Sequence, residues 1–365
     1  MQPQTERILG VTVENFTCFG RAELAFARGL NVFIGENGTG KSHVLKLLYA
    51  TLRGVDSDED ARRTDRTRNK VEAETHLADR LMGVFRPDSL GRLARRVPGR
   101  STARVSVTLA IDAGGDDLEA LQVDYDLSSH ARKKVKAVTA LPEVDTWSLY
   151  LPTREVISFY PGFLGLYERH TIEFDETYRD LCLALSTVEI RRGRRDASTQ
   201  ELVSELESRL GARITVEDDR FYVKSDAGKI EAHLVAEGLR KLATVMYLAL
   251  NGSLTQSTVL FWDEPEASLN PRYVTILADM LHTLADWGVQ VFIASHDYLL
   301  TQKLSLAAER AKAGENRSRF FLFRHGDDGV EVEAAPTLLD LSENPIADEF
   351  SEHYADEIGA ALDGP

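Results

Sequence analysis

Near the start of the chain, hydrophobic positions follow first a strand-like and then a helix-like spacing. The runs ILGVTVENF (8–16) and LNVFI (30–34) are typical of strands, and a charged turn region that contains glycine separates them. The second run continues through GENGTGKS into HVLKLLYATL (43–52), where apolar residues recur at helical spacing. The pattern therefore predicts a strand, a glycine-rich loop and a helix in succession.

The same alternation returns after residue 232. The segment HLVAEGLRKLATVMYLAL (233–250) predicts an apolar helix, and STVLFWDE (257–264) and VQVFIAS (289–295) predict buried strands. A helix from Pro271 is expected between these strands, because proline is favoured in the first turn of a helix. A final hairpin is expected near 319–334.

The middle of the chain is mixed. Polar residues, mainly arginine and aspartate, dominate from Gly54 to Arg100, which favours a helical insertion. Beyond it the spacing predicts a hairpin, a strand interrupted at Pro152, helices up to about Arg209 and two short strands. The extended runs lie at 103–111, 118–127, 148–163, 212–216 and 220–224.

Because strands and helices alternate at both ends, we expect an α/β fold with one core and a long insertion. The expected parts are an N-terminal piece of the core domain with an antiparallel β lobe, a mixed helical and β insertion, a C-terminal piece of the core domain, and a tail. They correspond to residues 1–55, 56–232, 233–335 and 336–365.

Composition narrows the class of protein. The 365 residues are 43% hydrophobic and 28% charged, as in a globular chain with a full core, and no run of 18 apolar residues predicts a membrane span. The N-terminus lacks the pattern of a signal peptide, and Cys18 and Cys182 are the only cysteines. A cytoplasmic protein without disulfides is therefore expected.

The charge of the chain argues against general nucleic-acid binding. With 43 basic and 58 acidic residues the formal charge is −15, whereas duplex binding depends on neutralising phosphates. Four basic runs nevertheless occur, at 61–70, 92–100, 131–136 and 191–195. Each is expected to be solvated surface unless several converge on one face.

The strongest chemical signal is GENGTGKS, which fits the phosphate-loop pattern G-x-x-x-x-G-K-S between a strand and a helix. Such a loop turns backbone N–H groups toward phosphate oxygens, and the positive end of the following helix adds to them. Lys41 is expected to reach the β- and γ-phosphates of ATP, and the Ser42 hydroxyl to hold Mg²⁺. The expected nucleotide-binding residues are Gly35, Asn37, Gly38, Thr39, Gly40, Lys41, Ser42 and His43.

Three further residues are expected beside this loop. Asp263 and Glu264 end an apolar strand, and ligands of open α/β sheets lie at the carboxyl ends of strands. We expect Asp263 to complete the Mg²⁺ shell and Glu264 to orient or deprotonate the attacking water. His296 follows the next buried strand, where a side chain could touch a γ-phosphate. Glu264, His296 and Lys41 are the candidate catalytic residues for ATP hydrolysis.

Together these motifs resemble ABC-type AAA ATPases of the RecF/SMC/OLD branch. The opening strands with GENGTGKS resemble the N-terminal lobe of that branch, FWDEPEASLNP its Walker B motif and D-loop, and IASHD its switch histidine. The segment LYLPTREVISFYPGFLGLYERH resembles ATPases of bacterial anti-phage defence systems of the PARIS and OLD type. The resemblance implies a P-loop NTPase of ABC type that uses ATP and Mg²⁺.

The resemblance also implies a dimer, because ATPases of this branch hold ATP between the P-loop of one subunit and the signature helix of the other. VAEGLRKLA resembles the signature L-S-R-G-Q-L-K-L-L, with Gly238 on its glycine and Lys241 on its lysine. Ala236 replaces the serine that would meet the γ-phosphate, and Leu239 replaces glutamine, so slow hydrolysis is expected. Arg240 or Lys241 is a candidate to supply the missing contact.

The Q-loop residue of this branch stays open between two places in the sequence. Gln122 lies in a predicted strand, whereas Arg154 and Glu155 lie in the PTREV segment. The lack of a clear Q-loop glutamine and the long insertion disfavour a transporter subunit.

The expected function is an ATP-driven dimerising switch in anti-phage defence. It is expected to act as a homodimer or higher homo-oligomer with a separate effector protein, a nuclease or toxin, since no nuclease module fits after residue 335. The alternative is a RecF-like DNA repair or replication ATPase that binds DNA directly. A further alternative is a scaffold that binds ATP but scarcely hydrolyses it. Glu264 argues against complete inactivity, whereas the altered signature permits slow turnover.

Overall fold

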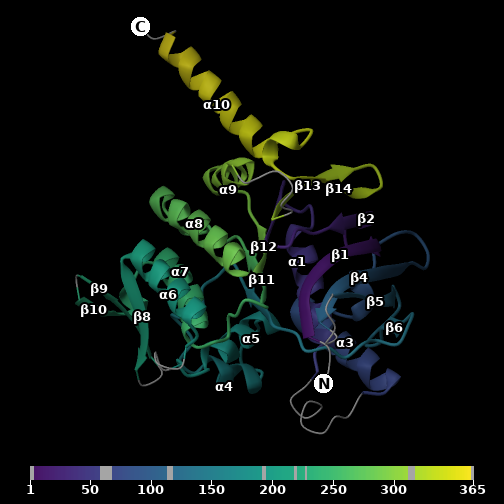
Figure 1. Cartoon of the computed structure of the whole chain (residues 1–365). Helices are drawn as coiled ribbons and strands as arrows, with labels where there is room; N and C mark the ends of the chain where they lie inside the picture. Colours follow the sequence, from purple (N-terminus) through teal and green to yellow (C-terminus); the bar gives the residue numbers. More distant parts are fainter. Residues whose placement is uncertain are drawn as a thin grey trace.

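The computed structural model describes residues 4–57, 68–112, 118–190, 195–217, 220–226, 228–310 and 317–362. Most of the basic runs 61–70 and 191–195 lies outside these residues. Within the described ranges the chain forms three β-sheets, with helices packed on and between them (Figure 1).

A six-stranded sheet forms the centre of the molecule, in the order β14-β13-β3-β12-β11-β7. Neighbouring strands run parallel except in the β13–β14 hairpin at one edge. Every residue of β3, β11 and β12 is buried, as is typical of parallel strands covered on both faces. The strands are β3 (Leu30–Gly35), β7 (Ser148–Leu151), β11 (Val259–Asp263), β12 (Gln290–Ala294), β13 (Ser318–Gly326) and β14 (Gly329–Ala335).

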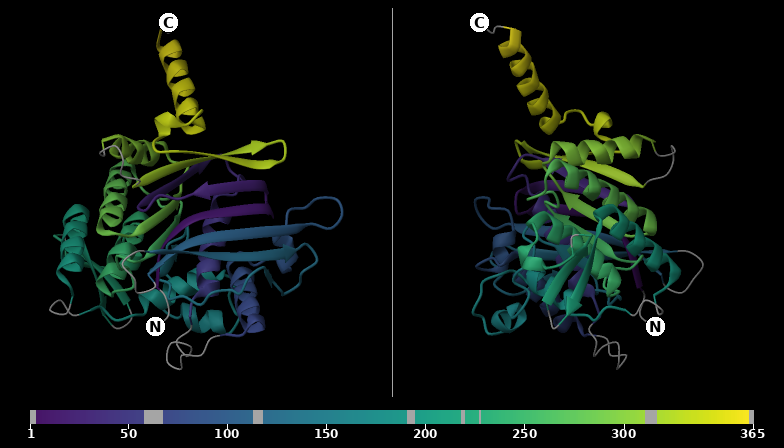
Figure 2. Two further views of the ribbon diagram at one scale, coloured as in Figure 1. Left: turned by 45° about the vertical axis from the view of Figure 1, so that its right-hand side comes forward. Right: turned by 90° about the vertical axis from the view of Figure 1, so that its left-hand side faces the viewer.

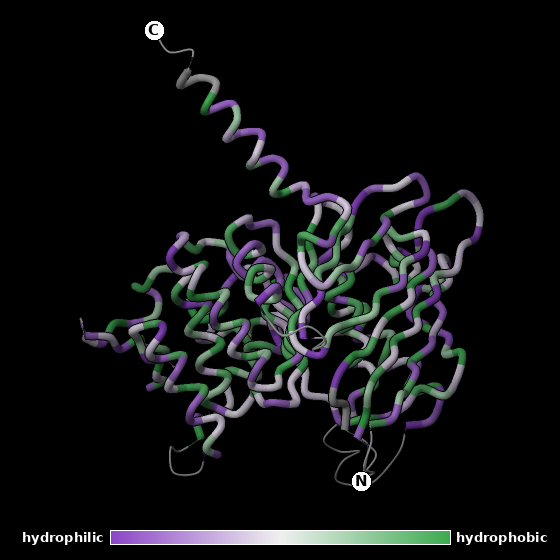
Figure 3. The backbone as a smooth tube through the Cα atoms, turned by 45° about the horizontal axis from the view of Figure 1, so that its top comes forward, coloured by the Kyte–Doolittle hydropathy of each residue, from purple (hydrophilic) through white to green (hydrophobic). Residues whose placement is uncertain are grey.

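An antiparallel sheet in the order β2-β1-β4-β5-β6 forms a lobe beside the central sheet (Figure 2). Hydrophobic and hydrophilic residues alternate along its strands (Figure 3), and the buried positions share one hydrophobic cluster with α1 and one face of the central sheet. The elements are β1 (Gln4–Phe16), β2 (Phe19–Ala25), β4 (Thr102–Asp112), β5 (Glu119–Ser128), β6 (Lys136–Ala137), α1 (Lys41–Val55), α3 (Lys70–Phe85) and η1 (Leu90–Leu93).

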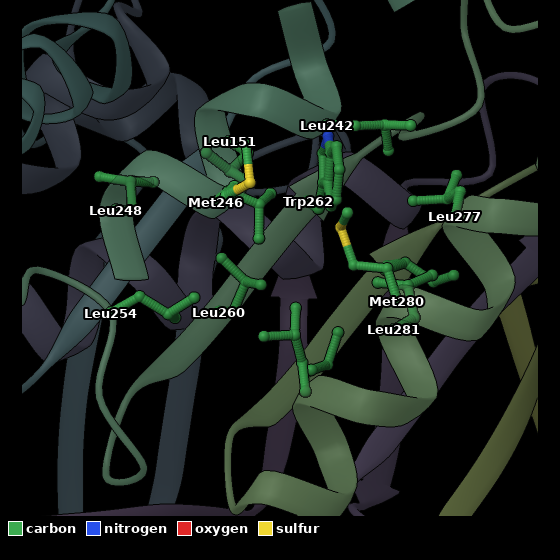
Figure 4. Close-up of a cluster of buried hydrophobic side chains, with 14 of the residues drawn as sticks. Leu151, Leu242, Met246, Leu248, Leu254, Leu260, Trp262, Leu277, Met280 and Leu281 are labelled. Atoms are coloured by element: carbon green, nitrogen blue, oxygen red, sulfur yellow. The ribbon is translucent and has the colours of Figure 1, made fainter. Parts of the chain in front are cut away.

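Helices cover the other face of the central sheet, together with a small antiparallel sheet in the order β10-β9-β8. The side chains of β11 alternate between two hydrophobic clusters, one on each face of the central sheet. Leu260 and Trp262 face α7 and α8 (Figure 4), whereas Val259 and Phe261 face the lobe. The elements are α4 (Phe163–Glu168), α5 (Glu176–Leu185), α6 (Ala197–Leu210), β8 (Ala212–Glu217), β9 (Arg220–Ser225), β10 (Gly228–Glu231), η3 (Ala232–Leu234), α7 (Glu237–Leu250), α8 (Pro271–Trp287) and α9 (Tyr298–Arg310).

The chain ends in η4 (Leu338–Asp340) and the long helix α10 (Pro345–Leu362), which projects away from the rest of the molecule (Figures 1 and 2). None of the described helices has the length and apolar character needed to cross a membrane.

The expected α/β fold, its antiparallel lobe and its final hairpin are confirmed. One expectation was wrong. The turn region after the first strand contains β2, whose alternating buried and exposed residues pair with β1. The tail after residue 335 contains α10, which hydrophobic spacing had not indicated. Strands from the range 56–232 join all three sheets, so this range does not form a separate layer.

Candidate nucleotide site

The phosphate loop connects β3 to α1 at the carboxyl edge of the central sheet. Gly35, Gly38 and Gly40 have φ values of 132°, 81° and 86°, in the left-handed half of the map that favours glycine. A Cβ at Gly40 would lie 2.5 Å from the Sγ of Cys18. The glycine pattern thus reflects both the backbone turn and the packing of the lobe against the loop.

Lys41 folds back over this loop. Its Nζ donates to the carbonyl oxygens of Gly35 and Glu36, each at 2.7 Å, and the Thr39 hydroxyl donates to Glu36 O at 2.8 Å. Burial lowers the pKa of Lys41, and the nearby carboxylates oppose this shift. Within the described part of the chain, the ammonium therefore donates hydrogen bonds only to backbone oxygens of the loop. Of the other loop residues, Asn37, Gly38 and His43 are exposed.

Asp263 ends β11 beside the loop. Its Oδ1 accepts a hydrogen bond from Ser42 Oγ at 2.9 Å, and its Oδ2 accepts one from the Tyr150 hydroxyl at 3.4 Å. Burial raises the pKa of Asp263, and the bond from Ser42 opposes the rise. Among the described residues no three His, Cys, Asp or Glu side chains gather as a metal cluster. A hydroxyl and a carboxylate nevertheless fit Mg²⁺, which takes few protein oxygens when phosphates and water complete its shell.

Glu264 and His296 face one another across the ends of neighbouring strands. The Oε1 of Glu264 lies 3.7 Å from Nδ1 of His296, and these side chains are 38% and 55% exposed. Glu264 has a φ of 47°, and its N–H donates to the carbonyl of Ala294 at 2.9 Å. This bond holds the turn after β11 against the end of β12. Because the side chains of Glu264 and His296 are both exposed, they are accessible to a ligand at the sheet edge.

The helix α7 begins close to this turn. Ala236, its exposed N-cap residue, makes no side-chain capping bond. Gly238 is buried, and a Cβ there would lie 2.4 Å from Leu269 Cδ2 and 2.8 Å from the carbonyl oxygen of Ser268. The turn that follows β11 therefore packs on α7 at the glycine, which is a structural reason for glycine at this position.

Arg240 and Lys241 are both engaged within the chain. Arg240 Nη2 lies 2.8 Å from Glu155 Oε1, and its Nη1 donates to the carbonyl of Val235. Lys241 is 3% exposed, and its Nζ lies 3.4 Å from the carbonyl oxygen of Glu264. The hypothesis that either side chain contacts the nucleotide of a second subunit stays a prediction.

The two candidate Q-loop regions lie far apart in the fold. Gln122 lies in β5 of the lobe, opposite Thr108 of β4. Arg154 and Glu155 follow β7, which pairs with β11 and therefore ends beside Asp263. The geometry thus favours the PTREV segment as the neighbour of the site.

Comparison with known proteins agrees with this geometry. The family model described as "AAA domain, putative AbiEii toxin, Type IV TA system" matches residues 109–301. The chain belongs to this AAA-domain family. A second family model, described as "AAA domain", matches residues 11–142 of the same chain. No curated protein is significantly similar in sequence.

Solved structures show the fold of this AAA-domain protein. It resembles an Smc head bound to the C-winged helix domain of ScpA, with 13% identity and a TM-score of 0.53 over 91% of this chain and 98% of that one. It also resembles an Smc head domain with an extended coiled coil, bound to the C-terminal domain of ScpA from Pyrococcus furiosus. That match has 12% identity and a TM-score of 0.52 over 97% and 100% of the two chains. The fold is that of an SMC head, a P-loop ATPase domain.

Sequence reasoning missed Glu266 of this AAA-domain protein. Glu266 is 7% exposed, and its Oε1 accepts bonds from Ser295 Oγ at 2.8 Å and from the N–H of His296 at 3.2 Å. Among the described residues its Oε2 has no hydrogen-bond partner. Burial raises the pKa of the Glu266 carboxyl group. The second acidic residue of DEPE was the available signal, since acidic side chains are seldom buried without a role.

Two of the basic runs converge on the lobe. The N–H groups of Leu90 and Gly91 donate to the carbonyls of Arg132 and Ala131, and the N–H of Ser129 donates to Ser101 O at 2.9 Å. These bonds bring the runs 92–100 and 131–136 together. We call their exposed cations the lobe basic face: Arg92, Arg96, Arg100, Arg132, Lys133, Lys134 and Lys136.

Proposed function

We propose that this AAA-domain ATPase is an ATP-driven dimerising switch. The supporting observation is the contact of Ser42 with Asp263 at the sheet edge, where the Glu264–His296 pair also lies. Lys41 would hold the β- and γ-phosphates, Ser42 and Asp263 the Mg²⁺ ion, and Glu264 the attacking water. The other expected loop residues would line the phosphates, and the end of α7 with Ala236 and Gly238 would face the ATP of a second subunit.

We propose anti-phage defence as its setting, with a separate nuclease or toxin as effector. The description of the matching family, which names a putative toxin of a Type IV TA system, supports this setting. The structurally similar Smc heads are bound to domains of ScpA, which supports a protein partner. The alternative is a RecF-like ATPase that binds DNA directly. The observation that supports this alternative is the lobe basic face.

The Glu264→Gln variant tests the switch. The amide keeps the size of the side chain but cannot take a proton from water, so ATP should stay bound and hold two subunits together. We expect a dimer in ATP and Mg²⁺, measured by light scattering after size exclusion, and a loss of hydrolysis of about a hundredfold or more.

The control Glu168→Gln, at an exposed position of α4, should keep wild-type turnover and mass. A Glu264→Gln protein that binds ATP at saturation yet remains monomeric would rule out the sandwich mechanism.

A further inference from the structure

The helix α10 has no cover along most of its length. Every residue from Asp348 to Ile358 is exposed, and the helix extends away from the body of its own chain in each view (Figures 1 and 2). Asn344 caps its first turn, with Oδ1 accepting from the N–H of Ala347 at 3.2 Å. The ring of Phe350 stacks on Tyr298 of α9, with centroids 4.5 Å apart. The base is thus anchored and the rest is free to meet another surface.

The exposed part of α10 has two distinct faces. Phe350, Tyr354 and Ile358 are spaced by four residues and therefore lie along one side, with exposures of 53%, 66% and 50%. Another side carries Asp348, Glu352 and Asp356, also spaced by four. Like charges at this spacing destabilise an isolated helix, and helices gain most of their stability from packing of an apolar face.

The acidic character of α10 indicates the chemistry of its ligand. Residues 345–362 contain five acidic side chains and neither lysine nor arginine. A cationic surface with exposed apolar side chains would relieve the repulsion and cover the apolar stripe. The lobe basic face fits, because it also presents Val97 and Val138, which are 40% and 60% exposed.

We propose that α10 of one copy binds the lobe basic face of a second copy. Since a helix on one copy meets a different surface on the other, the contact either closes reciprocally in a dimer or extends into rings or chains. It requires no ATP, so it is independent of the proposed sandwich dimer. The contact also covers the lobe basic face, which duplex DNA would need. Binding of α10 and binding of duplex DNA therefore exclude one another.

Sedimentation equilibrium of the full chain without nucleotide tests this proposal. We expect a mass above that of the monomer at about 50 mM salt, rising with protein concentration, and a return toward the monomer at about 500 mM, because salt screens exposed charges. Tyr354→Ala, which interrupts the apolar stripe without adding charge, and the pair Lys133→Glu with Lys134→Glu should each weaken association about tenfold or more. None of these side chains is buried, so the core is unaffected.

Matched controls make the same kinds of change elsewhere. Leu339→Ala shortens an apolar side chain that is 78% exposed in η4, and Arg220→Glu with Lys224→Glu changes two exposed cations of β9. Both controls should associate like the wild type. A monomer under all conditions, or association unchanged in the α10 and lobe variants, would overturn the proposal.

A duplex oligonucleotide separates the two occupants of the lobe basic face. If α10 covers this face, Tyr354→Ala should bind the duplex more tightly than the wild type does. Equal, strongly salt-dependent binding by both proteins, without self-association, would assign the face to nucleic acid instead.

Discussion

At the scale of single residues, the site is marked by carboxyls buried at the ends of strands. Asp263 and Glu266 are 8% and 7% exposed, and burial raises the pKa of both. A carboxylate held in this way destabilises the folded chain at neutral pH. Such a cost is typical of functional sites, where charge is positioned for a ligand at the expense of stability.

Replacing Glu266 by glutamine should separate stability from activity. Glutamine keeps an oxygen for Ser295 Oγ and the His296 N–H but removes the buried charge. Because the folded-state pKa of Glu266 is raised, its stabilising contribution is full below the usual carboxyl pKa of 4.5 and is lost as pH rises through the folded value. We therefore expect Glu266→Gln to raise the melting temperature by roughly 1–3 °C near neutral pH, and the gain to shrink toward about pH 4.

Thermal denaturation without nucleotide measures this difference, with Glu168→Gln as the exposed control. The rate of ATP hydrolysis should fall in Glu266→Gln, because the carboxylate no longer acts on His296 through its charge. A lower melting temperature near neutral pH would show that the charge of Glu266 stabilises the fold.

At the scale of elements, a buried ion pair joins the segment after β7 to the first turn of α7. The side chains of Glu155 and Arg240 are 5% and 13% exposed and lie 2.8 Å apart. The segment after β7 adjoins the nucleotide site of its own chain, whereas α7 is the element proposed to face a second subunit. This pair therefore provides a direct physical link between the two halves of the proposed switch.

Breaking the pair from either side should leave a buried charge. We expect Glu155→Gln and Arg240→Met each to lower the free energy of unfolding by about 3 kcal/mol, and the double variant to lose much less than the sum. Urea denaturation without nucleotide measures these values. Arg209→Met, which removes the exposed pairs with Glu205 and Asp279, should cost less than about 1 kcal/mol. Additive losses in the double variant would mean that the pair is not coupled.

At the scale of the whole molecule, ATP should act on folding and assembly together. A ligand that binds only the folded state stabilises it by about 2.7 kcal/mol at a concentration a hundred times its Kd. In the sandwich mechanism the second subunit is also a ligand, so stabilisation should depend on protein concentration.

We expect ATP and Mg²⁺ to raise the melting temperature of the Glu264→Gln protein, and the rise to grow as the protein is concentrated. Adding Lys41→Ala should abolish the rise, since the ammonium at the phosphate loop is lost. Differential scanning calorimetry at several protein concentrations provides the measurement. A rise that is the same at all concentrations would indicate ATP binding by single subunits.

Much of the site was predictable because its motifs are local. The phosphate loop depends on a strand, a turn that favours glycine and a helix, all between Leu30 and Val55, and Asp263 ends an apolar strand. Gly238 could be aligned from the sequence, but its contact with Ser268 and Leu269 depends on two segments meeting in space. Glu266 was missed for the same reason, since its partners Ser295 and His296 lie beyond the next helix and strand.

The sequence by itself determined the order of most strands and helices, though not β2 or α10. It also determined the phosphate loop and the residue types at the sheet edge, because backbone preferences and burial patterns act over a few neighbouring residues. Only the tertiary structure decided which side chains meet. It paired Arg240 with Glu155, buried Lys241, brought two basic runs together on the lobe and left α10 uncovered. These outcomes depend on contacts between segments far apart along the chain, which no local pattern encodes.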